Sequence, residues 1–351
     1  MQNQALTVSP STQSPSAALI LLPLRLVVGW TYFSVFWRRA ILADKLDPGA
    51  AGYVGEKFNN FLPGALGIKP VISFLVLHPD ILKWSMIAFT MVEALVGLCL
   101  MLGIFTRTMG VSAMLLAFGI LLGAGWLGTT CLDEWQIGIL GIASGVAFLL
   151  GGGGEYSVDA LLRRKGFSFT RSRRFTWLAS GELKVGKPAV VIGAAAVLSV
   201  TLVTNQYFHG GVYGPLHNKS IKPVVEISDA SITDGGLRFT VYRTEGVDVY
   251  GSFLVSVALL DDGKTIFKIA GPQLSQLPKS DIVNYHVAAV KPGTCGLVIP
   301  LGAKARISLN TGTAAIDKNR SYALSLTDVS GVRWQKPVTG VGGGGSSTAR
   351  P

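Results

Sequence analysis

The chain has 351 residues, of which 49% are hydrophobic and only 15% are charged, and its formal net charge is +11. Soluble domains carry about a quarter charged residues, so this composition excludes an ordinary soluble enzyme and indicates a membrane protein. The excess of Lys and Arg does not indicate nucleic-acid binding, because its densest cluster lies in one loop between apolar runs and is explained by membrane topology.

The N-terminal stretch 1–16 contains no Lys or Arg. A secretory signal has a basic first part and a small-residue cleavage site, and neither is evident here. We therefore expect residues 1–16 to be disordered and the apolar run that follows them to be a membrane-spanning helix.

Five apolar runs follow, and roughly 20 helical residues are needed to cross a hydrocarbon core of about 30 Å. The fourth run is short and needs its flanking residues to reach that length. We predict a four-helix transmembrane bundle within residues 17–162 and a fifth, separate anchor helix. The runs are 17–37, 84–104, 109–127, 136–151 and 188–204.

The loop 163–187, between the fourth and fifth runs, is the most basic segment of the chain. Because Lys and Arg are enriched in cytoplasmic loops, we predict that this loop is cytoplasmic. The N-terminus is then cytoplasmic as well, while the loop 38–83, the hairpin 128–135 and the chain after Thr204 lie outside. The cations of the basic loop are Arg163, Arg164, Lys165, Arg171, Arg173, Arg174, Lys184 and Lys187.

The chain changes character after the fifth run. From Lys222 it consists of short alternating segments separated by the turn sequences DGG, DDGK, KPGT and GVR. Seven or eight strands at this spacing predict a small antiparallel β-sandwich of immunoglobulin-like type over residues 205–338. The Gly-rich tail 339–351 is expected to be flexible. The predicted fold class is therefore a membrane α + β protein.

Two ionisable residues, Arg25 and Glu93, lie well inside apolar runs. An ionisable side chain at such depth is costly unless it is paired, and it is a candidate functional residue by default. At 1.5 Å per residue, Arg25 lies about 18 Å below Trp37 and Glu93 about 13 Å below Trp84, at the outer ends of their helices. We predict an Arg25–Glu93 ion pair, which either takes part in function or only fixes helix register.

Two of the three cysteines are predicted to lie outside: Cys131 in GTTCLDEW and Cys295 in KPGTCGLV. Cys99 lies deep in the second run and is expected to be inert. Thiols on the oxidising side of a membrane commonly form disulfides. A disulfide needs Cα atoms within about 7 Å, so a Cys131–Cys295 bond would place the β domain on the outer mouth of the bundle.

Several segments together resemble a known family. LRLVVGWTYFSVFWRRAILADKLDP, VEALVGLCLMLGIFTRT, GTTCLDEWQIG and the Gly-rich end of the fourth run resemble the DoxD-type small subunit of thiosulfate:quinone oxidoreductase, over roughly 17–162. That family belongs to the DoxX-like group of four-helix membrane proteins. YFHGGVYGPLHNKSIKP and the β segments resemble the DoxA-type subunit, over roughly 205–334. The chain is thus similar to two subunits fused in the order DoxD then DoxA.

The resemblance implies that thiosulfate is oxidised to tetrathionate on the outer side and that the electrons pass to a membrane quinone. It also implies the cytoplasmic membrane of a bacterium or archaeon, with the C-terminal domain on the periplasmic side. Two thiosulfate dianions repel each other, so binding needs cations. Arg38, Arg39 and Lys45, with Trp135, are the candidate substrate-binding residues, although Arg38 and Arg39 beside Trp37 equally suit interfacial anchoring.

For the chemistry, the candidate catalytic residues are Cys131, Cys295 and Glu134. A Cys131–Cys295 disulfide is either a structural staple or a redox-active bond that the sulfane sulfur of thiosulfate attacks, leaving a Cys–S–sulfonate intermediate. The neighbouring Asp133, Glu134 and Trp135 are unusual choices for an inert staple.

The candidate quinone-binding residues are Arg25, Glu93 and His78. The sequence contains no GxGxxG after a strand and no CxxC or CxxCH, so no flavin, haem, iron–sulfur or metal motif is evident. The expected partners are therefore thiosulfate, a quinone that acts as electron acceptor, and the lipid bilayer. Nucleic acid is not among them, and homo-oligomerisation is left open.

Two other classes of function stay open. One is a non-catalytic membrane anchor whose β domain recruits a partner enzyme. The other is a DoxX-like thiol or quinone redox protein that acts on a protein partner. Thiosulfate-dependent quinone reduction by the purified chain would discriminate among the three.

Overall fold

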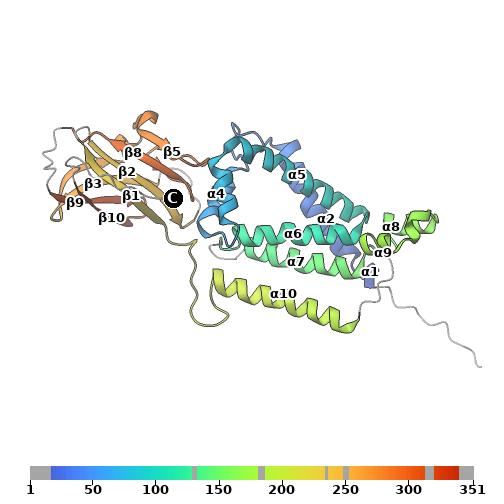
Figure 1. Ribbon diagram of the computed structural model, residues 1–351. Coiled ribbons are helices and arrows are strands. Elements are labelled where there is room, and N and C mark those ends of the chain that lie inside the picture. Colours follow the sequence, from blue (N-terminus) through green and yellow to red (C-terminus); the bar gives the residue numbers. More distant parts are fainter. Residues whose placement is uncertain are drawn as a thin grey trace, which may run out of the picture. The chain divides into compact units, whose positions relative to one another are not determined.

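The computed structural model describes residues 17–128, 133–180, 186–233, 236–247, 253–312 and 320–339 (Figure 1). The predicted disordered stretch 1–16, and the predicted flexible tail after Thr339, lie outside the described residues. The chain forms two compact units. The first contains Met1–Trp37, Met91–Ala117 and Leu140–Leu198, and the second contains Arg38–Thr90, Phe118–Ile139 and Ser199–Pro351.

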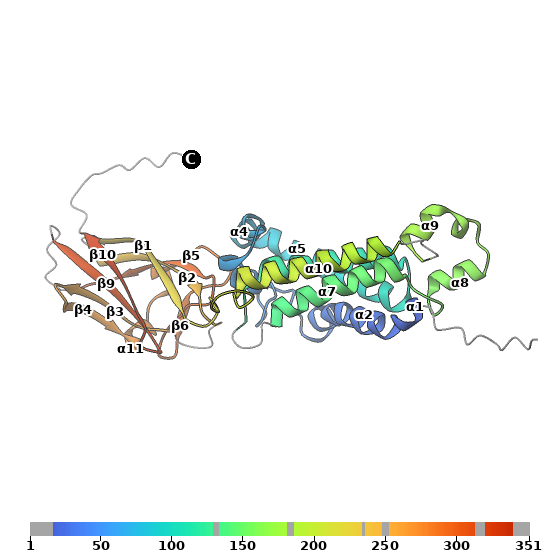
Figure 2. The ribbon, with the colours of Figure 1, turned by 90° about the horizontal axis from the view of Figure 1, so that it is seen from below.

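Four helices of the described chain are long and apolar enough to cross a bilayer, which confirms a multi-pass membrane protein. They correspond to the second to fifth predicted runs. The last of them is the separate anchor helix, and only 6% of its apolar window is buried within the chain. The helices are α5 Pro79–Leu102, α6 Thr106–Ala124, α7 Asp133–Gly151 and α10 Lys187–Phe208, all labelled in Figure 1; Figure 2 also labels α5, α7 and α10.

The first predicted run differs from a single uninterrupted helix. It begins as α1, Ala17–Ile20, and continues after Leu21 as α2, Leu22–Phe36. Pro23 stands in the first turn of α2, where its missing N–H costs no helical hydrogen bond, and this favours a new helix start there. A π-helix, η1, Trp37–Leu42, follows α2 directly.

The loop before α5 contains several short helices. The segment before α5 contains α3, Glu56–Phe61, the 3₁₀ turn η2, Leu62–Gly64, and α4, Lys69–Leu77. A small buried apolar cluster of Leu62, Ile72 and Val76 holds these elements together. The Trp126 indole N–H donates to the Phe61 carbonyl at 3.1 Å and fixes the end of α3.

The basic loop after α7 is also ordered over much of its length. It contains α8, Val158–Arg164, the 3₁₀ turn η3, Ser168–Arg171, and α9, Arg173–Leu178. Both α-helices start at a serine N-cap: Ser157 accepts from the Ala160 N–H and Ser172 accepts from the Phe175 N–H, each at 3.1 Å.

The C-terminal domain is an antiparallel β-sandwich, as predicted. One sheet has the order β1-β2-β8-β5, and the other has the order β10-β9-β3-β7-β6, with β4 also paired to β3. This is the strand order of an immunoglobulin-like sandwich, with β6 and β7 as additional short strands. The strands are β1 Val224–Thr233, β2 Gly236–Glu245, β3 Leu254–Asp261, β4 Lys264–Ala270, β5 Ile282–Asn284, β6 Lys291–Gly293, β7 Gly296–Val298, β8 Lys304–Leu309, β9 Ser321–Asp328 and β10 Arg333–Thr339.

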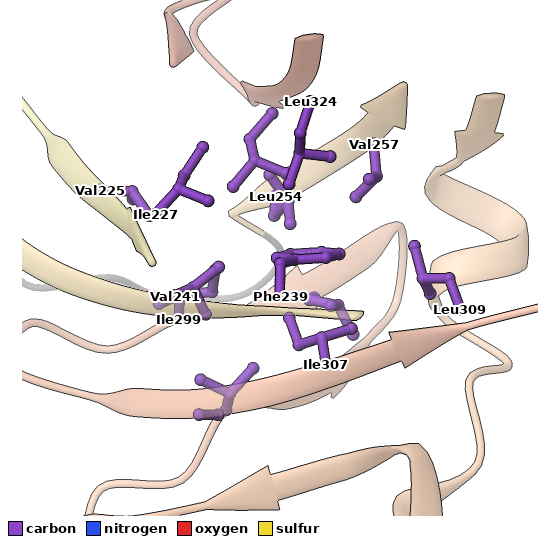
Figure 3. Close-up of a cluster of buried hydrophobic side chains, with 14 of the residues drawn as sticks. Val225, Ile227, Phe239, Val241, Leu254, Val257, Ile299, Ile307, Leu309 and Leu324 are labelled. Carbon is purple, nitrogen blue, oxygen red and sulfur yellow. The ribbon is translucent and has the colours of Figure 1, made fainter. Parts of the chain in front are cut away.

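The sandwich core is a single cluster of apolar side chains. Figure 3 shows Phe239 and Ile307 from one sheet and Leu254 and Leu324 from the other, which point toward one another between the layers. Each of these four side chains is fully buried. Alternation along the strands sends every second residue into this layer, so the hydrophobic pattern fixes which face of each strand lies inside.

Candidate functional site

The segment between α10 and β1 is hydrogen-bonded to the hairpin that joins α6 to α7. His209 Nε2 donates to the Gly125 carbonyl at 2.7 Å, and the Asn218 amide and the Ser220 hydroxyl both donate to the Gly128 carbonyl. We call residues 205–220 the strap. The strap thus fastens the part of the chain that leads into the sandwich to the hairpin that carries Cys131.

His209 is the buried centre of the strap. Since a carbonyl can only accept, the proton lies on Nε2, and the other ring nitrogen, Nδ1, is buried with no hydrogen-bond partner. Burial lowers the pKa of His209 below its ordinary value, the bond to Gly125 opposes this, and His217 adds to the lowering. The imidazole is therefore held neutral in this position.

Trp135 has a structural partner near the start of α7. The Trp135 indole N–H donates to the Thr204 hydroxyl of α10 at 3.0 Å. Glu134 lies in the first turn of α7, where a carboxylate interacts favourably with the helix dipole. The predicted roles of Glu134 in catalysis and Trp135 in substrate binding stay predictions.

The three predicted substrate-binding cations lie on and just after the π-helix η1. Arg38 is exposed, and Arg39 donates to the Thr90 hydroxyl at 3.3 Å. Lys45 is exposed and is held near Arg39 by its backbone N–H, which donates to the Arg39 carbonyl at 2.9 Å. The structure therefore groups these cations on one short segment, and their role in binding stays a prediction.

The predicted cysteine pair is described only in part. Cys131 lies outside the described residues. Cys295 is exposed in the tight turn between β6 and β7, where Gly293 and Gly296 are paired. A bond between Cys131 and Cys295, and a catalytic role for either thiol, stay predictions.

The predicted Arg25–Glu93 ion pair is wrong. The Arg25 guanidinium instead donates to the carbonyls of Gly153 and, at 2.5 Å, Tyr156. It also lies beside Gly103, since a Cβ there would be 3.0 Å from Arg25 Nη1. Glu93 is ten residues before Gly103, which is about 15 Å along the helix.

The reason for this error is the register of α2 against α5. The two helices touch at Gly29 and Gly97, where a Cβ on either glycine would lie within 3 Å of the other's carbonyl oxygen. Close approach at small residues is a common way for membrane helices to pack. This contact sets Arg25 opposite the end of α5 rather than opposite Glu93.

Glu93 is buried within the first unit, with 3% of its surface exposed. It interacts electrostatically with Tyr32, whose hydroxyl donates to the Ala113 carbonyl at 3.0 Å. Val96, Leu100 and Phe148 surround this region with apolar side chains. Glu93 is therefore a buried acidic group beside Tyr32, and its role in binding quinone stays a prediction.

The predicted quinone-binding residues belong to different units: Arg25 and Glu93 to the first and His78 to the second. His78 immediately precedes α5, Glu93 is fifteen residues further, and Arg25 lies at the level of Gly103. At 1.5 Å per residue, His78 and Glu93 are about 22 Å apart along α5, and Glu93 and Gly103 are about 15 Å apart. His78 is exposed, and its ring stacks near Phe74 at 4.3 Å between centroids. A role of any of the three in binding quinone stays a prediction.

A buried polar cluster that sequence reasoning missed lies in the first unit. Asp159 of α8 accepts hydrogen bonds from the Phe105 and Thr106 N–H groups at 2.8 and 3.1 Å, and from the Thr106 and Ser180 hydroxyls. Arg25 and Arg107 interact electrostatically with this carboxylate. Asp159 thus caps the start of α6, and we call these residues the Asp159 cluster.

Arg107 completes the Asp159 cluster. It is 1% exposed and donates from Nε to the Leu149 carbonyl at 3.0 Å and from Nη1 to the Thr176 carbonyl. Its own backbone N–H donates to the Ala179 carbonyl at 3.1 Å. The cluster therefore joins the ends of α6 and α7 to α8 and α9, and its polar groups are used for structure.

Four helices of membrane-spanning length, together with a β-sandwich domain that follows the strap, define a multi-pass membrane protein with a C-terminal β domain. Residues 20–186 match the family described as TQO small subunit DoxD, and residues 208–337 match the family described as TQO small subunit DoxA. The chain belongs to these thiosulfate:quinone oxidoreductase small-subunit families and carries both in one polypeptide. The two families support a thiosulfate:quinone oxidoreductase role.

Proposed function

We propose that the chain oxidises thiosulfate to tetrathionate and passes the electrons to a membrane quinone. The observation that carries this proposal is the strap: the start of the DoxA region is hydrogen-bonded to Gly125 and Gly128 of the DoxD region. Two subunit types fused and fastened in this way are suited to act as one enzyme.

The proposed reaction balances without a further co-reactant. Two thiosulfate dianions form one sulfur–sulfur bond and lose two electrons. One quinone takes up those two electrons together with two protons and becomes a quinol. A buried carboxyl group such as Glu93 is the kind of group that delivers protons in an apolar interior.

We propose that the sandwich lies on the periplasmic side of a bacterial or archaeal cytoplasmic membrane and that the N-terminus is cytoplasmic. The support for this orientation is the basic segment with α8 and α9, because Lys and Arg mark cytoplasmic loops. A reporter fused after Trp334 is expected to be active outside, and one placed within 163–187 inside. The opposite result would overturn the orientation.

The experiment that tests the function uses the purified intact chain in lipid nanodiscs with a short-chain ubiquinone analogue. Addition of thiosulfate is expected to reduce the quinone, whereas sulfate in its place is not. Reduction only by a reduced dithiol protein would instead support a thiol redox protein, and no reduction by either donor would support a membrane anchor.

A further inference from the structure

We propose that a cavity lined by Lys69, Ser73, Tyr242, His286 and Lys304 binds a small divalent sulfur oxyanion, with thiosulfate as the ligand. This inference rests on the proposed function and names the substrate site for it. All of these residues belong to the second unit. None was singled out by the sequence, because they are far apart in the chain.

The cavity is formed where α4 meets two strands of the sandwich. It has a volume of about 420 Å³, and Leu62 and Pro70 complete its wall. Small-molecule sites commonly have about 300–1,000 Å³ and combine an apolar lining with a few polar groups. This cavity has that composition, with two ammonium groups, a hydroxyl, a phenol and an imidazole.

The edge of the cavity is held firmly. Gly302, which precedes β8, packs so closely on α3 that a Cβ there would lie 1.7 Å from the Asn59 carbonyl oxygen. The Gly302 carbonyl accepts a hydrogen bond from His286 Nδ1 at 2.8 Å. The imidazole orientation, and with it one wall of the cavity, is therefore fixed by the backbone.

The charge balance of the cavity favours an anion. Lys69 and Lys304 supply two positive charges from opposite walls, and Lys69 is anchored by donating to the Pro63 carbonyl at 3.1 Å. Lys304 lies 5.9 Å from the centre of the Tyr242 ring. The carboxylate of Glu226 acts on Tyr242, its register partner across β1 and β2, and is not among the residues that line the cavity. The lining carries two lysines and no carboxylate, so a dianion would meet a net positive charge there.

The neutral groups of the cavity are suited to hydrogen bonding. Burial raises the pKa of Tyr242 to about 12, with Glu226 adding to the effect, so the phenol keeps its proton and can donate. Burial also lowers the pKa of His286, and Lys304 adds to the lowering. Attraction for the anion therefore rests on the two lysines, while the phenol and the Ser73 hydroxyl can fix its orientation.

The test is thiosulfate kinetics on the intact chain in nanodiscs. Lys304→Gln and Lys69→Gln are each expected to raise the KM for thiosulfate about tenfold and to leave kcat within about twofold. Matched controls are Lys264→Gln and Lys268→Gln, which remove exposed lysines from β4 in the other sheet. Lysine variants with the KM of these controls would overturn the pocket while leaving the proposed function intact.

A binding measurement separates the pocket from the reaction. Thiosulfate and sulfate are each expected to raise the thermal unfolding midpoint of the wild-type chain, and Lys304→Gln is expected to lose most of that shift. If the wild-type chain shows this shift but no quinone reduction, the proposed function fails and the anion site stands. An equal shift in the wild type and in both lysine variants would place the anion elsewhere and overturn the site.

Discussion

The two units use charged side chains in different ways. In the first unit, Asp159 and Arg107 are almost fully buried and bond to backbone groups of neighbouring helices. In the second unit, Lys69 is exposed, Lys304 is partly exposed, and both line a cavity. A buried charge with several backbone partners is committed to the fold, whereas cations at a cavity wall can still exchange water for a ligand.

The same contrast separates Arg25 from Glu93 within the first unit. Arg25 looked functional because of its depth, but it bonds to the carbonyls of Gly153 and Tyr156 at the end of α7. Glu93 is buried in the middle of α5 beside Tyr32. Depth in an apolar run is therefore a weaker indication of function than the kind of partner that the side chain has.

The largest expected effect comes from breaking the Asp159 cluster. Asp159→Ala leaves two backbone N–H groups and two hydroxyls without their acceptor, and should cost about 3 kcal/mol or more of stability. Thermal unfolding of detergent-purified protein measures this loss. Glu155→Ala, an exposed neighbour, serves as the control and is expected to unfold like the wild type. An Asp159→Ala protein as stable as this control would contradict a structural role.

A large effect on turnover rather than stability is expected at Glu93. Glu93→Gln removes the carboxyl group and should lower kcat for quinone reduction on the order of a hundredfold, since general acid–base catalysis typically contributes about 10²–10⁴-fold. The KM for thiosulfate should stay unchanged. Tyr32→Phe, which removes the hydroxyl bonded to Ala113 but keeps the carboxyl group, should change kcat less than about threefold. A folded Glu93→Gln protein with wild-type turnover would make Glu93 structural.

An intermediate effect concerns acid sensitivity of the strap. The folded pKa of His209 is lowered, so below its ordinary value of 6.5 the unfolded chain binds a proton that the folded chain does not. Stability should therefore fall as the pH drops below about 6.5. His209→Gln can still donate to the Gly125 carbonyl but does not titrate. The thermal unfolding midpoint of the His209→Gln protein is expected to fall less than that of the wild type as the pH is lowered from about 7.5 to about 5. If the unfolding midpoints of the two proteins fell equally with pH, His209 would be excluded as a source of the acid sensitivity.

The smallest effect is expected at the start of α7. Trp135→Phe removes one hydrogen bond to Thr204 and should cost about 1 kcal/mol. Thr204→Val and the double variant complete a mutant cycle that isolates this bond. Trp177→Phe, at an exposed position, should have no effect on stability. A coupling energy of zero in the cycle would mean that Trp135 does not hold α10.

Length and periodicity were enough to predict most of the fold. The length of an apolar run predicted α5, α6, α7 and α10, and alternation of apolar and polar residues predicted the strands of the sandwich. Both signals are contained within a single element, so they can be read without knowing its neighbours. The partner of Arg25 could not be predicted in this way, because apolar length does not determine the register between two helices. The small residues Gly29 and Gly97, where α2 and α5 touch, were the available signal.

The strap and the anion cavity were hidden from the sequence for related reasons. His209 and Asn218 bond to backbone carbonyls, and every residue has a carbonyl, so sequence does not specify the acceptor. Lys69 and Lys304 lie on α4 and β8, and only the packing of α3 against Gly302 shows that these elements meet. The hairpin itself was recognised as important, but its Trp135 has a structural partner in α10.

The most direct measurement of the central claim is the joint yield of both products from the intact chain. Purified protein in quinone-loaded nanodiscs is given limiting thiosulfate, and quinol and tetrathionate are quantified in the same sample. The account predicts one tetrathionate for each quinol and two thiosulfates consumed. Quinol formed without tetrathionate, or no quinol at all from folded protein, would contradict it.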